Sequence, residues 1–223
     1  MRLAIFDLDH TLLAGDSDYL WGQFLVEIGV LDHSYHWREN ERFYEQYKAG
    51  TLDILEFCAF SLRPLSQHEP AQLQKWRTEF VKTKIIPIIA PGAPALLERH
   101  RAQGDTLLIT TATNHFITEP IAELLGVPNL IALDPEMRDG RYTGQVAGVP
   151  NFQSGKVTRL KSWLQGQAPF AHKTAYSDSR NDIPLLELAD TAVAVDPDDT
   201  LRAEAQKRGW PIISLREKLP ELT

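Results

Sequence analysis

Residues 3–11 of the 223-residue chain read Leu-Ala-Ile-Phe-Asp-Leu-Asp-His-Thr, and this segment is the strongest indication of the fold class. Four apolar residues are followed at once by two acids, Asp7 and Asp9. A short, uninterrupted apolar run is typical of a strand that is buried on both faces of a parallel sheet. Ligands of such sheets bind at the carboxyl ends of the strands. We therefore predict a strand that delivers two carboxylates to a ligand site.

The seventy residues that follow have a helical pattern without a strand signal. Apolar residues recur at three- and four-residue steps, and glycine or proline interrupts the pattern at intervals. The predicted helices are one around 20–28 that ends at Gly29, one through 43–47 that ends near Gly50, one from about 51 to 62 that Pro64 helps to end, and one over 72–84. Four helices in succession indicate a separate helical unit.

Helices and strands alternate after Pro91-Gly92. Helices are predicted at 94–103, 117–125, 155–164 and 183–188, strands at 106–110, 173–176, 192–195 and 211–214, and a hairpin with Asp139-Gly140 at its turn within 137–146. This alternation predicts an α/β fold with a doubly wound parallel sheet. The core then comprises residues 1–13 and 86–223, and an inserted four-helix cap comprises residues 14–85.

Composition and charge exclude several classes of partner. Hydrophobic residues make up 43% of the chain and charged residues 24%, so a core can form, and the net charge is −7 without a basic run. These values argue against nucleic acid and membrane surfaces as partners. No segment approaches the ~20 apolar residues of a membrane span, and Cys58 is the single cysteine. We expect a cytoplasmic monomer or small homo-oligomer, in which any site for an anion must supply local positive charge.

Three further polar elements fall at or beside predicted strand ends. Thr111 ends the second strand, Lys156 opens a helix, and a third element, Asp178, Asn181 and Asp182, follows the strand at 173–176. A hydroxyl and a lysine suit phosphate oxygens, and carboxylates suit Mg²⁺. Each element alone also has an ordinary structural explanation: an acidic loop, a helix start with Thr113 or Asn114 as N-cap, an exposed lysine, a turn. Their joint order favours a phosphate site.

With these motifs the sequence resembles the haloacid dehalogenase (HAD) superfamily, in its phosphoserine-phosphatase-like branch. The first motif of that family, DxDx[TV], matches Asp7, Asp9 and Thr11, and its second-motif hydroxyl matches Thr111, at the spacing from Leu125-Gly126 that this branch uses. The third-motif lysine matches Lys156, and the DxxND motif matches Asp178, Asn181 and Asp182. The resemblance covers essentially the whole chain, including a helical cap between the first two motifs.

The resemblance implies a Mg²⁺-dependent phosphatase that forms an aspartyl phosphate. By it, Asp7 is the nucleophile and Asp9 the general acid and base. Mg²⁺ would be held by the Asp7 and Asp178 carboxylates and the Asp9 carbonyl, with Asp182 behind them. Thr111 and Lys156 would bind phosphoryl oxygens, and Asn181 would orient the nucleophile or the substrate.

The expected substrate is a small phosphorylated metabolite beneath the cap. Asp16 lies nine residues after Asp7, where phosphoserine phosphatases carry a glutamate that meets the substrate ammonium; Asp16 is equally placed as an N-cap. The third helix lacks the cap arginine of those enzymes, since Arg63 comes only at its end. This departure favours histidinol phosphate, the substrate of HAD-type histidinol phosphatases, over phosphoserine. Aromatic residues of the cap, Trp21, Phe24, Phe57 and Phe60, line the site or form the core of the cap.

Two other functions stay open at this point. One is a phosphotransferase or mutase on the same scaffold, which would transfer phosphate to an alcohol instead of water. The other is a non-catalytic phosphometabolite sensor. The residues that argue against a sensor are Asp7, Asp9, Lys156 and Asp178.

Overall fold

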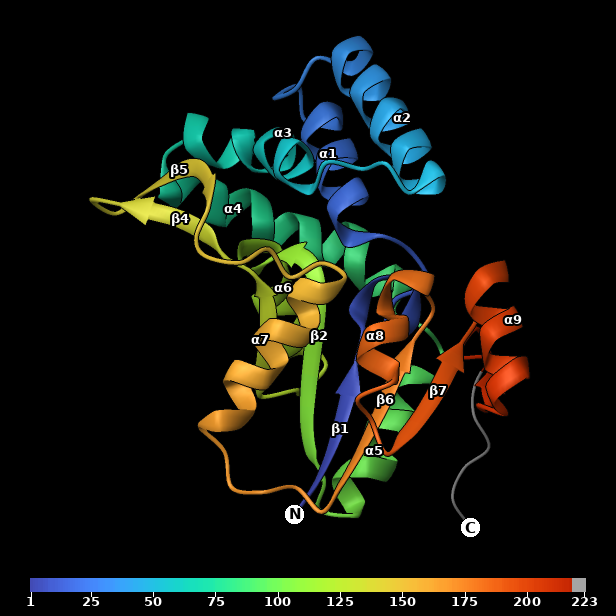
Figure 1. Ribbon diagram of the computed structural model, residues 1–223. Coiled ribbons are helices and arrows are strands. Elements are labelled where there is room, and N and C mark those ends of the chain that lie inside the picture. Colours follow the sequence, from blue (N-terminus) through green and yellow to red (C-terminus); the bar gives the residue numbers. More distant parts are fainter. Residues whose placement is uncertain (218–223) are drawn as a thin grey trace.

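The computed structural model describes residues 1–217, and a six-stranded sheet runs through its centre (Figure 1). The strand order is β3-β2-β1-β6-β7-β8, and every neighbouring pair is parallel. The strands are β1 (Arg2–Phe6), β2 (Thr106–Asn114), β3 (Asn129–Leu133), β6 (His172–Ser177), β7 (Thr191–Val195) and β8 (Ile212–Ile213). This arrangement confirms the predicted doubly wound α/β fold.

Helices cover both faces of the sheet because β1 is apolar on both sides. Ala4 and Phe6 pack in one cluster with side chains of α5 (Ala93–Ala102) and α6 (His115–Leu124). Leu3 and Ile5 pack in a second cluster with side chains of α7 (Ser154–Gln165), α8 (Ile183–Leu186) and α9 (Asp199–Arg208). The period of two along a strand sends alternate residues to opposite faces, which makes β1 the central buried strand.

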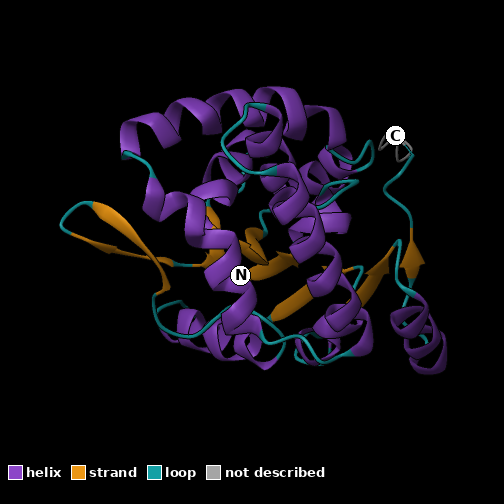
Figure 2. Ribbon diagram, turned by 90° about the horizontal axis from the view of Figure 1, so that it is seen from above, coloured by secondary structure: helices purple, strands orange, loops and turns teal. Residues whose placement is uncertain are grey.

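Four helices inserted between β1 and β2 lie over the carboxyl ends of the strands (Figures 1 and 2). They are α1 (Ser17–Glu27), α2 (His33–Ala49), α3 (Ile54–Gln67) and α4 (Pro70–Phe80), and a π-helical turn over Val81–Ile85 continues α4. The first three begin at aspartates, and each aspartate accepts a hydrogen bond from a backbone N–H of the first turn. Gly50 ends α2 in the left-handed conformation, as predicted.

The predicted bounds of the third helix, about 51 to 62, were wrong at both ends. It begins only at Ile54, because Asp53 caps it, and it runs through Pro64 to Gln67. A proline inside a helix removes one backbone hydrogen bond. Here Leu62 and Leu65 are fully buried on either side of Pro64, and their packing keeps the helix intact. Two elements were not predicted at all, β3 and α9.

A hairpin of β4 (Pro135–Arg138) and β5 (Arg141–Val146) projects from the core beside the inserted helices (Figure 1). Its turn, Asp139-Gly140, has both residues at positive φ, as the sequence predicted. A Cβ added at Gly144 in β5 would lie 3.1 Å from the Ser66 hydroxyl of α3, so the hairpin backbone contacts that helix directly. No helix within residues 1–217 has both the length and the hydropathy to cross a membrane.

Candidate functional site

Asp7 lies at the carboxyl end of β1, beside the end of β6. The strand order reverses direction between these two strands, which is where open α/β sheets form their ligand crevice. After Asp7 the chain makes a tight π-helical turn, Leu8–Leu12, with His10 at φ 57°. This turn returns Thr11 to the strand end. The Thr11 hydroxyl lies 3.2 Å from both Asp7 Oδ2 and Asp178 Oδ1 and can donate to either. The structure thus brings together two carboxylates from distant parts of the chain.

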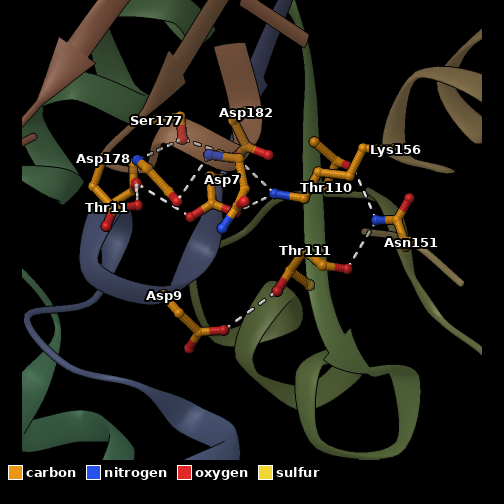
Figure 3. A network of polar contacts seen from close by, with 12 residues as sticks. Asp7, Asp9, Thr11, Thr110, Thr111, Asn151, Lys156, Ser177, Asp178 and Asp182 are labelled. Carbon is orange, nitrogen blue, oxygen red and sulfur yellow. Dashed lines mark hydrogen bonds and ion pairs between the residues drawn. The ribbon is translucent and has the colours of Figure 1, made fainter. Parts of the chain in front are cut away.

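Lys156 joins this cluster from the first turn of α7. Its ammonium donates to Asp7 Oδ1 and to Asp182 Oδ2, each at 2.7 Å (Figure 3). The Ser177 hydroxyl also donates to Asp182 Oδ2, at 2.8 Å. Lys156, Asp7 and Asp182 are all buried. Because anions stabilise the N-terminal turn of a helix, the two carboxylates account for a lysine that would otherwise oppose the helix dipole.

The pKa values of the clustered carboxyls are raised. Burial raises the pKa of Asp7 to about 7; Lys156 opposes this rise, and Asp182 adds to it. Burial and the charges of Asp7 and Asp182 raise the pKa of Asp178 well above its ordinary value. Burial acts to lower the pKa of Lys156, but Asp182 and Asp7 outweigh it and raise that pKa. Three carboxylates thus share one ammonium, an excess of negative charge that suits a hard cation.

A divalent cation fits the side of this cluster that faces Asp178. Asp7 and Asp178 each place an oxygen 3.2 Å from the same hydroxyl, so they lie within about two hydrogen-bond lengths of each other. Within residues 1–217 no three His, Cys, Asp or Glu side chains form a ready-made metal cage. The fit therefore depends on two carboxylates supplemented by other oxygens, a donor set that Mg²⁺ accepts.

Asp9 lies apart from this cluster, on the side of β2 (Figure 3). Its carboxylate accepts hydrogen bonds from the Ser17 N–H at 2.7 Å, the Thr113 hydroxyl at 2.7 Å and the Thr111 hydroxyl at 3.3 Å. The π-helical turn gives Asp9 separate hydrogen-bond partners on the neighbouring strand, and Asp7 and Asp9 both line one cavity.

Thr111 lies in the last part of β2 and is almost fully buried. Besides its bond to Asp9, its hydroxyl accepts from the Thr113 N–H at 3.1 Å. Asn151 holds the strand in place: its amide nitrogen donates to the Thr110 hydroxyl, the Thr111 carbonyl and the Ile131 carbonyl, at 2.8–3.0 Å. No sequence pattern indicated Asn151, and Thr113 was only a candidate N-cap. Asn114 is the actual cap of α6.

Asp16 and Asn181, predicted to contact substrate, both line the same cavity. Asp16 is also the N-cap of α1, where it accepts from the Tyr19 N–H at 2.9 Å. The two interpretations of Asp16 are therefore compatible. Asn181 accepts from the Gln153 side chain at 2.9 Å.

The cavity has a volume of about 270 Å³ and lies between the strand ends and the inserted helices. Its floor includes Asp7, Asp9, Thr111, Lys156 and Asp178. Its roof comes from α1, α2 and α3, with the aromatic residues Tyr19, Phe43, Tyr44, Tyr47 and Phe57. Of the four aromatic residues that the sequence singled out, only Phe57 lines this cavity. Trp21 and Phe24 pack against Phe80 in the helical core, and Phe60 stacks on His36.

Comparisons with known proteins agree with this geometry. A model of the haloacid dehalogenase-like hydrolase family matches residues 4–187. A histidinol-phosphatase of Neisseria meningitidis is 41% identical over 96% of this chain and 99% of its own length. A phosphoserine phosphatase of Mycobacterium tuberculosis is 31% identical over 96% of this chain and 70% of its own length.

Solved structures show the same fold. A protein of unknown function from Bordetella pertussis superimposes with a TM-score of 0.90 at 46% identity, over 96% of this chain and 98% of that one. A substrate-bound phosphoserine phosphatase superimposes with a TM-score of 0.69 at 17% identity, over 97% of this chain and 93% of that one. The arrangement of sheet and inserted helices is thus shared with both.

Proposed function

The chain belongs to the haloacid dehalogenase-like hydrolase family, and we propose that it is a Mg²⁺-dependent phosphomonoesterase. Its substrate is a small, amine-bearing metabolite phosphate, which it hydrolyses through an aspartyl phosphate on Asp7. One observation carries the proposal: the buried Asp7 carboxylate lies at the strand end between Lys156 and the Thr11–Asp178 pair, on the floor of the cavity. This position offers a nucleophile beside a cationic group.

The residues divide the reaction between two sides of the cavity. An Asp7 oxygen attacks phosphorus, and the bond from phosphorus to the substrate oxygen breaks while Asp9 gives that oxygen a proton. Asp9 then removes a proton from water, and the hydroxide attacks the aspartyl phosphate, which releases phosphate and restores Asp7. Thr111, Thr113 and the Ser17 N–H orient Asp9 for both transfers.

The other groups hold the phosphate and the metal. Lys156, anchored by Asp182, and Thr111 bind phosphoryl oxygens. Mg²⁺ would be held by Asp7, Asp178 and the Asp9 carbonyl, and it would neutralise charge on the transferring phosphoryl group. Asn181 lies at the cavity wall to orient the substrate.

Two observations favour histidinol phosphate over phosphoserine as the substrate. The histidinol-phosphatase relative is more similar to this chain than the phosphoserine phosphatase of M. tuberculosis, at 41% against 31% identity. Within residues 1–217, Lys156 is the only lysine or arginine that lines the cavity, so a substrate carboxylate would have no cationic partner in the cap. Asp16 is placed to receive an ammonium group.

The cap and core boundaries belong to the same proposal: a core of residues 1–13 and 86–223 and a cap of residues 14–85. The chain leaves and re-enters the core side by side, because Ala14 N–H donates to Ile88 O and Ala90 N–H donates to Leu12 O. Leu13 and Ile89 form the β-bridge between these hydrogen bonds. The bridge supports a boundary between cap and core close to these positions. We further propose that the enzyme works in the cytoplasm as a monomer or small homo-oligomer.

The test is a panel of phosphate esters with Mg²⁺, including histidinol phosphate, phosphoserine, 2-aminoethyl phosphate and p-nitrophenyl phosphate, measured as kcat/KM for the wild type and for Asp7→Asn. We expect histidinol phosphate to rank first, and Asp7→Asn to lose roughly 10³-fold or more in kcat on every ester, with an unchanged circular dichroism spectrum.

A chelator provides the second arm of this test. EDTA should abolish the phosphatase activity of the wild type, and added Mg²⁺ should restore that activity. Wild-type turnover by Asp7→Asn would exclude Asp7 as the nucleophile. Full activity in EDTA would exclude a catalytic role for Mg²⁺. A higher kcat/KM for phosphoserine than for histidinol phosphate would exclude histidinol phosphate as the preferred substrate.

A further inference from the structure

Asp18 lies in the first turn of α1, two residues after Asp16, and the mechanism above gives it no role. Its side chain lines the cavity over Asp7, and it also lines a second cavity of about 200 Å³ inside the cap. In the described part of the chain, Asn40 and Ser61 are the other residues that line both cavities. Asp18 therefore lies where the catalytic cavity extends into the cap.

The hydrogen bonds of Asp18 leave half of its carboxylate unused. Oδ1 accepts from the Ser61 hydroxyl at 3.3 Å and from the Asn114 side-chain amide at 3.4 Å. Both donors are neutral and both bonds are long. Oδ2 has no hydrogen-bond partner within residues 1–217, although a carboxylate oxygen can accept two such bonds. Asp18 thus presents a vacant acceptor beside the cavity.

The charge of Asp18 also lacks a partner. No lysine, arginine or histidine within residues 1–217 forms an ion pair with it. Burial raises the pKa of Asp18 to about 7, and repulsion from Asp16 and Asp9 adds to that rise. A donor or cation from a bound molecule would relieve this unfavourable environment, because a hydrogen bond to a charged group is stronger than one between neutral groups.

The cavity over Asp7 that Asp18 lines also has aromatic side chains in its walls. Phe43, Tyr44 and Tyr47 of α2 and Phe57 of α3 line the same cavity. Aromatic rings pack well against a planar ring and interact favourably with cations. The combination of aromatic walls and a carboxylate suits a planar nitrogen heterocycle better than an aliphatic chain.

We infer that Asp18 accepts a hydrogen bond from a ring N–H of the substrate, where the cavity over Asp7 borders the second cavity in the cap. This inference rests on the proposed function, which places the phosphate at Asp7, Thr111 and Lys156. Two carboxylates, Asp16 and Asp18, then receive two separate nitrogen groups of one substrate, its ammonium and its heterocycle. Histidinol phosphate carries both groups, whereas 2-aminoethyl phosphate carries only the ammonium.

The test is the specificity ratio of Asp18→Asn. We measure kcat/KM with Mg²⁺ for histidinol phosphate and for 2-aminoethyl phosphate, and we divide the first by the second. The ratio should fall roughly 10- to 100-fold relative to the wild type, because only histidinol phosphate loses a charge-assisted hydrogen bond. A ratio within twofold of the wild-type value overturns the inference.

Matched variants separate recognition from a structural role. Asp16→Asn should lower kcat/KM for both esters and leave the ratio near its wild-type value. Asp53→Asn makes the same chemical change at the exposed start of α3, outside both cavities, and should leave the ratio unchanged. If Asp18→Asn fails to fold, Asp18→Ser removes the carboxylate and keeps a small polar side chain in the first turn of α1, and it must show the same fall. A wild type inactive on both esters would instead overturn the proposed function, and the inference with it.

Discussion

The carboxylates that line the cavity carry more negative charge than the nearby cationic side chains of the protein neutralise. Burial raises the pKa of Asp7 and of Asp18 to about 7 and that of Asp16 to about 6. In each case a neighbouring carboxylate adds to the rise. Holding ionised acids in such a place costs stability. Perturbed carboxyls that gather in a cavity are typical of a functional site, where a ligand or metal completes the charge balance.

The raised pKa of Asp18 predicts how the stability of the protein changes with pH. Its pKa is about 7 in the folded protein against an ordinary 3.8, so the folded state holds the proton more tightly. The stability linked to this proton is complete below pH 3.8 and is lost as the pH rises through about 7. Asp18→Asn cannot ionise and avoids this loss. We therefore expect the melting temperature of Asp18→Asn to gain on that of the wild type from pH 5 to pH 8, measured without metal or substrate.

The comparison isolates one group because the two proteins share every other titrating residue. The repulsion between Asp16 and Asp18 also disappears in the variant, and this acts in the same direction. A difference in melting temperature that stays constant between pH 5 and pH 8 would contradict the assignment of the raised pKa to Asp18.

At the scale of elements, the placement of α7 depends on one glycine. A Cβ at Gly155 would lie 2.0 Å from the backbone oxygen of Pro150, so the helix start and the preceding loop approach more closely than any side chain permits. Gly155 immediately precedes Lys156, whose ammonium bridges Asp7 and Asp182. This close approach fixes the point from which Lys156 reaches the cluster.

Gly155→Ala should therefore damage both stability and catalysis. The added methyl group must displace backbone, which costs about 1–3 kcal/mol of unfolding free energy. The same displacement should move Lys156 and lower kcat by roughly tenfold or more. Urea unfolding and p-nitrophenyl phosphate turnover measure the two effects. Gly166→Ala at the other end of α7 is the control, since its Cβ would meet only the Trp163 carbonyl oxygen, at 3.6 Å. Equal effects of the two substitutions would contradict the argument.

The elements that the sequence predicted well have strong periodic signals. The helix predicted at 155–164 is α7, and the Asp139-Gly140 turn is where it was expected. The signal is weak in α9, where only Leu201 and Ala205 are buried among charged residues. The apolar run of β3 is only five residues long, and a run of that length does not by itself distinguish a strand from a helix. β3 is held in place by its pairing with β2, and α9 by the packing of its two buried residues against the sheet.

The sequence singled out residues that the structure brings together at one cavity, but not the hydrogen bonds that connect them. Local motifs identified Asp7, Asp9, Thr111, Lys156 and the 178–182 loop. Thr113 could have been found, because it lies two residues after Thr111 and a strand period of two places both hydroxyls on the side of Asp9. Asn151 could not have been found, because its three hydrogen bonds connect it to β2 and β3, which only the fold brings together. Tertiary partners of this kind leave no local pattern.

At the scale of the whole molecule, the loop that carries Asp178 also holds the cap. The Arg180 guanidinium donates to the carbonyls of Tyr47 and Lys48, at 2.7 and 2.9 Å, at the end of α2. The Tyr47 hydroxyl lies 3.0 Å from the Ser179 hydroxyl. A cation at the carboxyl end of a helix is favourable, because the last carbonyls carry partial negative charge. The proposed metal-binding loop of the core is thereby fastened to the roof of the cavity.

Arg180→Ala should weaken the attachment of the cap to the loop that carries Asp178. Losing hydrogen bonds from a charged donor costs about 1–3 kcal/mol, so we expect kcat/KM to fall roughly tenfold, mainly through KM, because the roof closes less firmly over the substrate. The backbone amides of Gly50 and Thr51, which bond to carbonyls in the last turn of α2, should exchange with deuterium faster. Arg208→Ala is the matched control, since Arg208 pairs only with Glu187 and Glu204 on the far side of the core within the described residues. Unchanged amide exchange in Arg180→Ala would show that the cap is held in place by other contacts.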